Sequence, residues 1–402
     1  KMTEIQKEPI ETCCACGSSD LKLITALPKF PHVGIFINER EEEKNSPLVD
    51  NDLYACEFCG HVQLGYALDP GFLYTSEFQH RTSQSVTAKQ ANDFIFDFAQ
   101  KVVGGKKVEL VAEIGCNDTF LLQKFAEKGA DVAGVDPIWR GNEHVFLEGL
   151  SEHLKPRFHV VGDFIENVDF EARFQKRPDV YITNFVFEHL KEPCEVVRSI
   201  LDQAKPDATV IIGVPGAEFL LLNSRFDQLS HQHYQQFTIE SLTHMIKRAG
   251  GEILDIGINF TVWGQIMVAF KKGTPVVESK VDMKFDPEGV QASFRSFNNQ
   301  IDMMKERVRF LHDKEIYGMG AAQNFPVFAY FYGEEMPFSE ILDDHPLRQN
   351  KMFPHFPYKI VTPSGSYVGS VGILTAADYG RVLVGRMAQL GFDHVVLPFT
   401  SV

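Results

Sequence analysis

The chain of 402 residues is long enough for two or three domains with separate hydrophobic cores. Its net charge of −15 at pH 7 argues against nucleic acid or an anionic membrane as a partner, because both attract a basic face. No run of about 18 apolar residues is present, and the opening segment KMTEIQKEPI lacks the apolar core of a signal peptide. We therefore expect a cytoplasmic protein that acts on a small molecule.

Two Cys-x-x-Cys-Gly motifs occupy residues 13–17 and 56–60. Each cysteine pair can span one edge of a tetrahedron, and the trailing glycine permits the turn that points both sulfurs at one ion. Because four thiolates leave a metal no open position, we predict a structural zinc ion. The expected ligands are Cys13, Cys16, Cys56 and Cys59, and Cys14 could replace Cys13. A disulfide or a redox pair is the alternative interpretation.

Residues 72–101 divide into two halves. The second half has apolar residues at positions 91, 94, 95 and 98, the spacing of a helix that leads into the next domain. The first half mixes Phe78 and His80 with hydroxyl residues. This composition is typical of a lid or of a loop that touches substrate, although a surface loop has the same composition.

Residues 108–136 read as half of a nucleotide-binding βαβ unit: a buried strand, a tight turn, an amphipathic helix and a second strand. Gly115 allows a ligand to approach the backbone where the first strand ends. Asp136 follows it by 21 residues, about the distance at which a carboxylate meets ribose hydroxyls. The turn has one glycine where a dinucleotide site has three, which favours S-adenosylmethionine. An α/β core strand with an incidental acid is the alternative.

Further strands are predicted within residues 158–164, 178–190 and 208–216, separated by helical stretches. Such alternation predicts a mainly parallel sheet whose ligand lies at the carboxyl ends of the strands. Asp163 and Asn184 should gather there with Gly115 and Asp136.

A helix is predicted from its N-cap Thr238 to a stop at residues 250–251. His231, Gln232 and His233 precede it, in backbone expected to be extended or irregular. Two histidines two residues apart would then point the same way and could face one cleft. General acid–base work is favoured over metal binding, because no further ligand lies at a helpful spacing; histidines that only form hydrogen bonds are the alternative.

From about residue 294 the pattern starts afresh, with a helix, a strand, a Gly318-Met319-Gly320 turn and a second strand that ends at Asp343. This second Rossmann-like start could place a phosphate at a helix N-terminus. Gln323 stands where NAD sites have a small residue, so a nucleotide-sugar diphosphate, or no ligand, is as plausible as NAD. We predict an α/β protein with a zinc-binding domain at 1–75, a methyltransferase domain at 76–285 and a C-terminal Rossmann-like domain at 286–402.

In their order and spacing, these stretches resemble the bacterial sugar C-methyltransferases that act on nucleotide-linked keto-sugars. The family's Glu-Ile-Gly-x-Asn-Asp-Gly motif is matched at 113–119, its Asn-x-x-Glu-His turn at 184–189 with one extra residue, and its Phe-Asp-x-x-Tyr-His-Glu-His signature at 226–233. Departures from the family fall in the active-site signature and the lid stretch: Ser230 replaces tyrosine, Gln232 replaces glutamate, and His80 replaces an aromatic residue. These departures predict a different sugar or a different methylated position, and loss of activity is the alternative.

The resemblance implies that a base removes the proton beside a ketone and that the enolate attacks the sulfonium methyl of S-adenosylmethionine. His233 is the expected base, His231 or His189 would orient it or relay the proton, and Gln232 would donate to the enolate oxygen. The other implied cofactor residues are Glu113, Asn117 and Asp118, and the expected substrate residues are Phe78, His80, Ser230, Gly318 and Gly320. O- or N-methylation, or a binding role without catalysis, are the alternatives.

Overall fold

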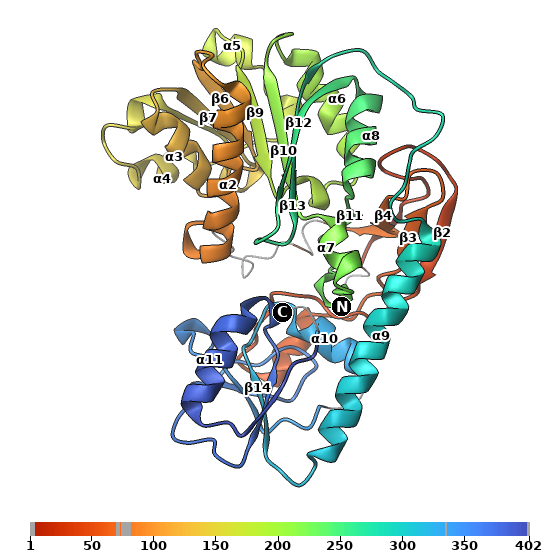
Figure 1. The fold of residues 1–402 in the computed structure, drawn as a ribbon. Coiled ribbons are helices and arrows are strands. Elements are labelled where there is room, and N and C mark those ends of the chain that lie inside the picture. Colours follow the sequence, from red (N-terminus) through yellow and green to blue (C-terminus); the bar gives the residue numbers. More distant parts are fainter. Residues whose placement is uncertain (1–4, 70–72, 74–81, 334–335, 400–402) are drawn as a thin grey trace.

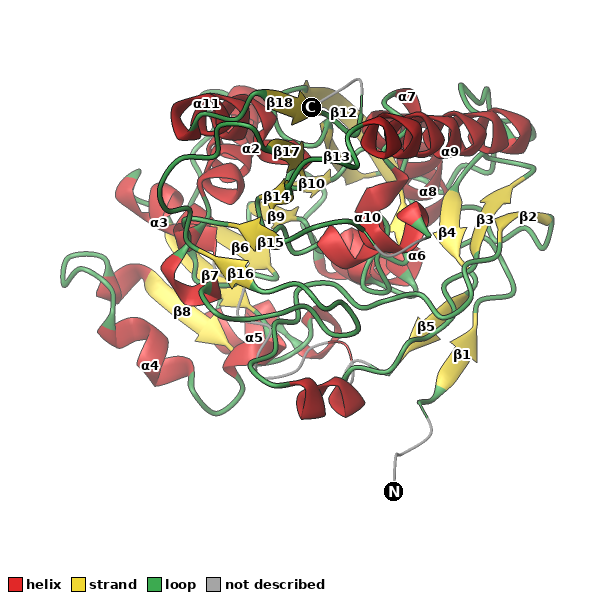
Figure 2. Ribbon diagram, turned by 90° about the horizontal axis from the view of Figure 1, so that it is seen from below, coloured by secondary structure: helices red, strands yellow, loops and turns green. Residues whose placement is uncertain are grey.

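The computed structural model describes residues 5–69, 73, 82–333 and 336–399. In Figure 1 the central domain lies above the C-terminal domain, and the long helix α9 (Pro287–Phe310) runs down the side that joins them. Figure 2 shows the strands β2 (Leu21–Thr25) and β3 (Leu53–Cys56) of the N-terminal module next to α9, with which both are in contact. No helix among the described residues combines the length and the apolar character needed to cross a membrane.

The N-terminal module is built on antiparallel strands. A four-stranded sheet has the order β11-β4-β3-β2, and β1 pairs with β5. The strand β11 comes from the central part of the chain, so the N-terminal sheet is completed by the segment that follows the predicted histidines. The strands are β1 (Lys7–Pro9), β2 (Leu21–Thr25), β3 (Leu53–Cys56), β4 (Val62–Leu64), β5 (Tyr66–Leu68) and β11 (Gln235–Gln236).

The central domain contains a seven-stranded sheet of order β12-β13-β10-β9-β6-β7-β8. The five strands from β10 to β8 are parallel, as predicted, and β13 joins β10 antiparallel. The strands are β6 (Leu110–Ile114), β7 (Asp131–Val135), β8 (Phe158–Val161), β9 (Val180–Asn184), β10 (Thr209–Val214), β12 (Gly251–Asn259) and β13 (Gln265–Lys272). The interior strands read as continuous apolar runs because helices cover both faces.

Two hydrophobic cores lie on the two faces of this sheet, one with α2 and α3 and the other with α6 and α8. In α8 the hydroxyl of Thr238 accepts the N–H of Ser241, and Gly250 ends the helix with φ 102°, which confirms the predicted cap and stop. The helices are α2 (Val86–Val103), α3 (Phe120–Glu127), α4 (Glu143–Glu148), α5 (Phe170–Phe174), α6 (Pro193–Gln203), α7 (Ala217–Leu222) and α8 (Ile239–Ala249).

The C-terminal domain has a five-stranded parallel sheet of order β16-β15-β14-β17-β18. Helix α9 starts at Pro287, seven residues before the predicted start, because Asp286 caps it by accepting the N–H of Gly289. The elements are β14 (Ile316–Met319), α10 (Phe325–Tyr332), β15 (Glu340–Leu342), β16 (Ile360–Val361), β17 (Val371–Leu374), α11 (Gly380–Leu390) and β18 (His394–Val396).

Short 3-10 helices occupy many of the connections. They are η1 (Arg40–Asn45), η2 (Thr82–Gln84), η3 (Pro137–Trp139), η4 (Lys155–Arg157), η5 (Ile165–Asn167), η6 (Phe187–His189), η7 (Phe226–Gln228), η8 (Pro346–Arg348) and η9 (Ala377–Tyr379). One of them, η7, helps to join two domains: the buried Arg225 just before it forms ion pairs with Asp227 and, across the domain boundary, with Asp378.

Candidate active site and metal centre

Four cysteine sulfurs converge in the N-terminal module. Sγ of Cys13 lies 3.6 Å from Sγ of Cys59, and Sγ of Cys16 lies 3.5 Å from Sγ of Cys56. All four sulfurs lie within 4.8 Å of one another. A tetrahedral zinc ion with bonds of about 2.3 Å holds its sulfurs about 3.8 Å apart, so the cluster has the dimensions of a zinc site with four thiolate ligands.

The turns of the two motifs explain this convergence. Gly17 and Gly60 have φ of 80° and 70°, a conformation that glycine adopts without strain. Cys14 points away from the cluster and donates its S–H to the carbonyl of Lys191 at 3.3 Å, so the fourth ligand is Cys13. Burial raises the pKa of Cys14 to about 11, which keeps it a thiol.

The turn after β6 begins with Gly115 at φ 70°. A Cβ on this residue would lie 2.3 Å from Cγ2 of Val186. We expected a ligand to approach the backbone at this point. On the side where a Cβ would point, the structure places Val186 of the loop after β9, which couples that loop to the turn; the approach of a ligand stays a prediction.

Asp136 lies at the end of β7 and is buried. Its Oδ2 accepts the N–H of Asn117 at 3.0 Å and its Oδ1 accepts the N–H of Ile138 at 3.1 Å. An ionised carboxylate can accept about four hydrogen bonds. The residue therefore shapes the turn after β6, and its contact with ribose hydroxyls stays a prediction.

Two more acids lie in or beside this turn. Glu113 is buried in β6, and burial, followed by the charges of Asp136 and Asp118, raises its pKa well above the usual range. Its Oε2 accepts no hydrogen bond from the part of the chain that the structure describes. Asp118 accepts the backbone N–H of Ser83 at 2.8 Å, and this hydrogen bond connects η2 to the turn.

Asp163 and Asn184 follow β8 and end β9, and the sheet order brings both to the edge that carries the turn after β6. Asp163 accepts Nη2 of Arg140 at 2.8 Å on the solvent side. Asn184 belongs to an internal amide chain: its Oδ1 accepts Nε2 of Gln265 at 2.8 Å, and its Nδ2 donates to Asn92 at 3.3 Å. Both side chains thus already have protein partners.

His231 and His233 have separate surroundings. Nε2 of His231 lies 2.8 Å from the carbonyl oxygen of Val49, and its ring centroid lies 4.4 Å from that of His32. Both partners belong to the N-terminal module. Residues 231–232 form a turn, so the alternation expected of extended backbone does not apply and the two side chains diverge.

His233 instead joins a cluster at the loop after β9. Its ring centroid lies 4.8 Å from that of His189, with the ring planes 80° apart. Oε1 of Glu188 lies 3.7 Å from Nε2 of His189. Burial raises the pKa of Glu188 to about 8, and burial with the neighbouring His189 lowers the pKa of His233 to about 3. Glu188 is not among the predicted site residues, and its only signal in the sequence is its place in the matched Glu-His turn.

Gln232 and Ser230 flank His231 in the sequence. Gln232 is buried and donates its amide to the carbonyl of Leu73 at 3.2 Å. Ser230 is buried in the same turn. Phe78 and His80 lie outside the described residues.

The C-terminal domain repeats the turn geometry of the central one. Gly320 follows β14 with φ 98°, and the next N–H, that of Ala321, donates to Asp343 at 2.7 Å. Arg348 also reaches Asp343, at 3.1 Å. Gly318 lies within β14 itself, where a Cβ would be 3.2 Å from Phe338, so it is part of the packed strand.

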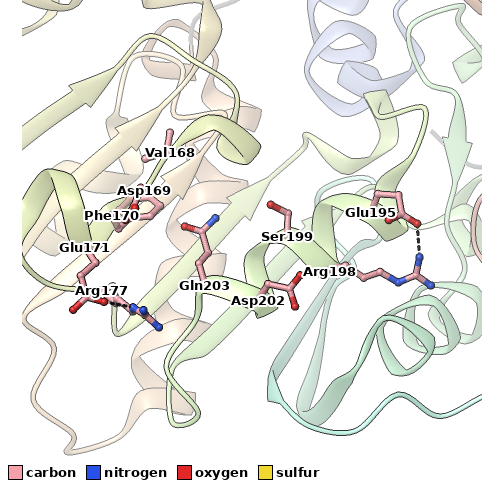
Figure 3. Close-up of a pocket in the computed structure, with 10 residues that line it drawn as sticks. All are labelled: Val168, Asp169, Phe170, Glu171, Arg177, Glu195, Arg198, Ser199, Asp202 and Gln203. Carbon is pink, nitrogen blue, oxygen red and sulfur yellow. Dashed lines mark hydrogen bonds and ion pairs between the residues drawn. The ribbon is translucent and has the colours of Figure 1, made fainter.

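Two surface hollows lie away from these residues. One of about 580 Å³ lies between α5 and α6 and is lined by the ion pairs Arg177–Glu171 and Arg198–Glu195 (Figure 3). A second, of about 510 Å³, lies between the N-terminal module and the C-terminal domain near Tyr330. Neither hollow is lined by a predicted site residue.

Family comparisons assign the two N-terminal parts of the chain. A methyltransferase domain model matches residues 87–256, and a zinc binding domain model matches residues 13–74. The chain is a methyltransferase. The zinc binding match and the four-cysteine cluster together confirm the predicted metal site, and the methyltransferase domain supports S-adenosylmethionine as the second cofactor.

Among curated proteins, the methyltransferase is similar to the C-methyltransferase NovU of Streptomyces niveus, with 23% identity over 395 residues, 94% of this chain and 92% of that protein. It is also 24% identical to the ubiquinone biosynthesis O-methyltransferase of Bordetella avium over 155 residues, 36% of this chain and 63% of that protein. The solved magnesium protoporphyrin IX methyltransferase of Synechocystis PCC 6803 is 16% identical, with a TM-score of 0.38, over 47% of this chain and 84% of that one.

Proposed function

We propose that this methyltransferase transfers a methyl group from S-adenosylmethionine to a carbon atom of a nucleotide-linked keto-sugar. The similarity to a C-methyltransferase over nearly the whole chain supports transfer to carbon. One geometric observation carries the proposal: Val186, on the loop that bears Glu188 and His189, packs directly on Gly115 of the turn that would hold the methyl donor. The proton-handling cluster and the donor turn are therefore held together as one unit.

In this proposal His233 takes the proton beside the ketone. Its lowered pKa keeps the imidazole neutral near pH 7, so its lone pair can accept a proton. A weak base needs help to hold that proton. Glu188 supplies it in its ionised form, because a carboxylate in the same buried cluster stabilises an imidazolium. Its pKa of about 8 means that this form becomes the major one only above about pH 8, so activity should rise with pH through this range.

Other residues have supporting roles in the proposal. Asp136 accepts the ribose hydroxyls, with Glu113, Asn117 and Asp118 shaping the turn around them. Asp163 and Asn184 complete the donor side at the same sheet edge. For these residues the expected effect of substitution is weaker binding of the methyl donor, with little change in proton removal.

On the substrate side, Gln232 would donate to the enolate oxygen by exchanging its bond to Leu73 for one to substrate. We propose that the sugar contacts Ser230, Phe78 and His80. The nucleotide would contact the segment that contains Gly318 and Gly320. His231 is proposed as a positioning residue, since it fastens the turn to Val49.

Solvent deuterium exchange tests this proposal. The full-length enzyme is incubated in D2O with S-adenosylhomocysteine and each of a panel of nucleotide-linked keto-sugars, and the sugars are examined by mass spectrometry. We expect deuterium at the carbon beside the ketone, and loss of that exchange by on the order of a hundredfold in His233→Ala. No exchange with any keto-sugar, together with methylation on oxygen or nitrogen when S-adenosylmethionine replaces S-adenosylhomocysteine, would refute the proposal and favour O- or N-methyl transfer.

A further inference from the structure

Glu188, His189 and His233 bring two imidazoles and one carboxylate together at the carboxyl edge of the central sheet. One ligand atom from each lies within 4.8 Å of the others. The cluster is separate from the four cysteines and draws on two segments, η6 and the turn before β11. Two histidines and one acid are a set that binds divalent transition metals in many proteins.

The orientation of His189 favours a metal ligand. Its Nδ1 lies 2.9 Å from the carbonyl oxygen of Gln232, so Nδ1 carries the hydrogen and Nε2 is the acceptor nitrogen. Nε2 is the atom that lies 3.7 Å from Oε1 of Glu188. Metal-binding histidines commonly donate their other ring N–H to a carbonyl in this way, which fixes both tautomer and ring direction.

Glu188 gives an independent reason to expect a cation. The residue is 2% exposed, and its Oε2 accepts no hydrogen bond from any described residue. Burying a carboxylate without a partner is costly. No lysine or arginine is paired with it among the described residues, so a bound cation would supply the missing positive charge.

We propose that Glu188, His189 and His233 form a second metal site, which takes a divalent transition-metal ion such as Zn²⁺, Co²⁺ or Mn²⁺. The two nitrogen ligands disfavour Ca²⁺ and Mg²⁺, which take oxygen ligands. Three protein ligands leave the ion an open position. A metal bound there uses the lone pair of His233, so it inhibits methyl transfer; this consequence, unlike binding itself, rests on the proposed function.

Metal counting on the full-length chain tests binding without substrate or methyl donor. Native mass spectrometry after titration with Co²⁺ should show two metal ions on the wild type. The absorption spectrum of the second bound Co²⁺ ion should lack a thiolate charge-transfer band. Glu188→Gln and His233→Ala should each lose one ion and keep the cysteine-bound one. The matched control is His244→Gln, which alters a buried histidine paired with Glu278 at 2.8 Å outside the cluster; it should keep both.

The retained cysteine-bound ion and an unchanged near-ultraviolet circular dichroism spectrum show that each variant is folded. A single ion on the saturated wild type, or a second ion that persists in Glu188→Gln, would overturn the proposal. If the second ion binds but does not slow methyl transfer, the metal site stands and the role of His233 as base fails. If no methyl transfer is found with any substrate, the count of bound ions is unaffected.

Discussion

Lowering the pH should destabilise the fold through His231, and replacing that residue should remove most of this sensitivity. The side chain is 3% exposed and bonds the carbonyl of Val49 at 2.8 Å, so it holds the turn to the N-terminal module. Burial is the main cause that lowers its pKa from 6.5 to about 4. The charged imidazole is therefore disfavoured in the folded protein.

The number of protons bound in the folded and unfolded states decides whether stability rises or falls with pH. Between pH 6.5 and pH 4 the unfolded chain binds more protons at His231 than the folded chain does, so the free energy of unfolding falls as the pH falls through this window. With these two pKa values, the loss is about 2 kcal/mol at pH 5 and about 3 kcal/mol below pH 4.

Urea unfolding of the wild type and of His231→Gln at pH 7.5 and pH 5 measures this loss. Glutamine can still donate to Val49 but does not titrate, so the stability advantage of the wild type should shrink by about 2 kcal/mol between the two pH values. His312→Gln, which alters an exposed histidine, should keep the wild-type dependence. Equal pH dependence in the wild type and His231→Gln would refute the reasoning and return His231 to the list of candidate catalytic groups.

Local patterns predicted the positions of those residues whose placement depends on local geometry. The two cysteine motifs are such a case, because each fixes its own turn and the ion only requires that the turns meet. The strand ends that carry Gly115 and Asp136 are another, since a parallel sheet brings consecutive carboxyl ends to one edge. The same logic located Gly320 and Asp343 in the C-terminal domain.

The histidine cluster could not be predicted in this way. Glu188 and His233 are 45 residues apart in the sequence, and their proximity depends on how the loop after β9 packs against the turn before β11. The expectation that His231 and His233 share a cleft assumed extended backbone. The turn at residues 231–232 breaks that assumption, and β11 then joins the N-terminal sheet, a pairing with no local signal.

Three further predictions concern the cofactor sites. Replacing Cys16 with serine should abolish stoichiometric zinc binding by the cysteines, measured by native mass spectrometry, and should lower the thermal midpoint. Asp136→Asn should weaken binding of S-adenosylmethionine by roughly 1–3 kcal/mol in calorimetry, because an uncharged amide accepts ribose hydroxyls less well. Gly115→Ala should destabilise the fold by about 2–4 kcal/mol, since the residue has φ 70° and its Cβ would lie 2.3 Å from Val186. The control is Gly129→Ala, where φ is 96° but no atom lies within 4 Å of the added Cβ, so only the backbone cost of about 1–2 kcal/mol applies. Equal losses in the two glycine variants, measured by urea unfolding, would mean that Val186 does not press on Gly115, and the link between the donor turn and the histidine cluster would fail with it.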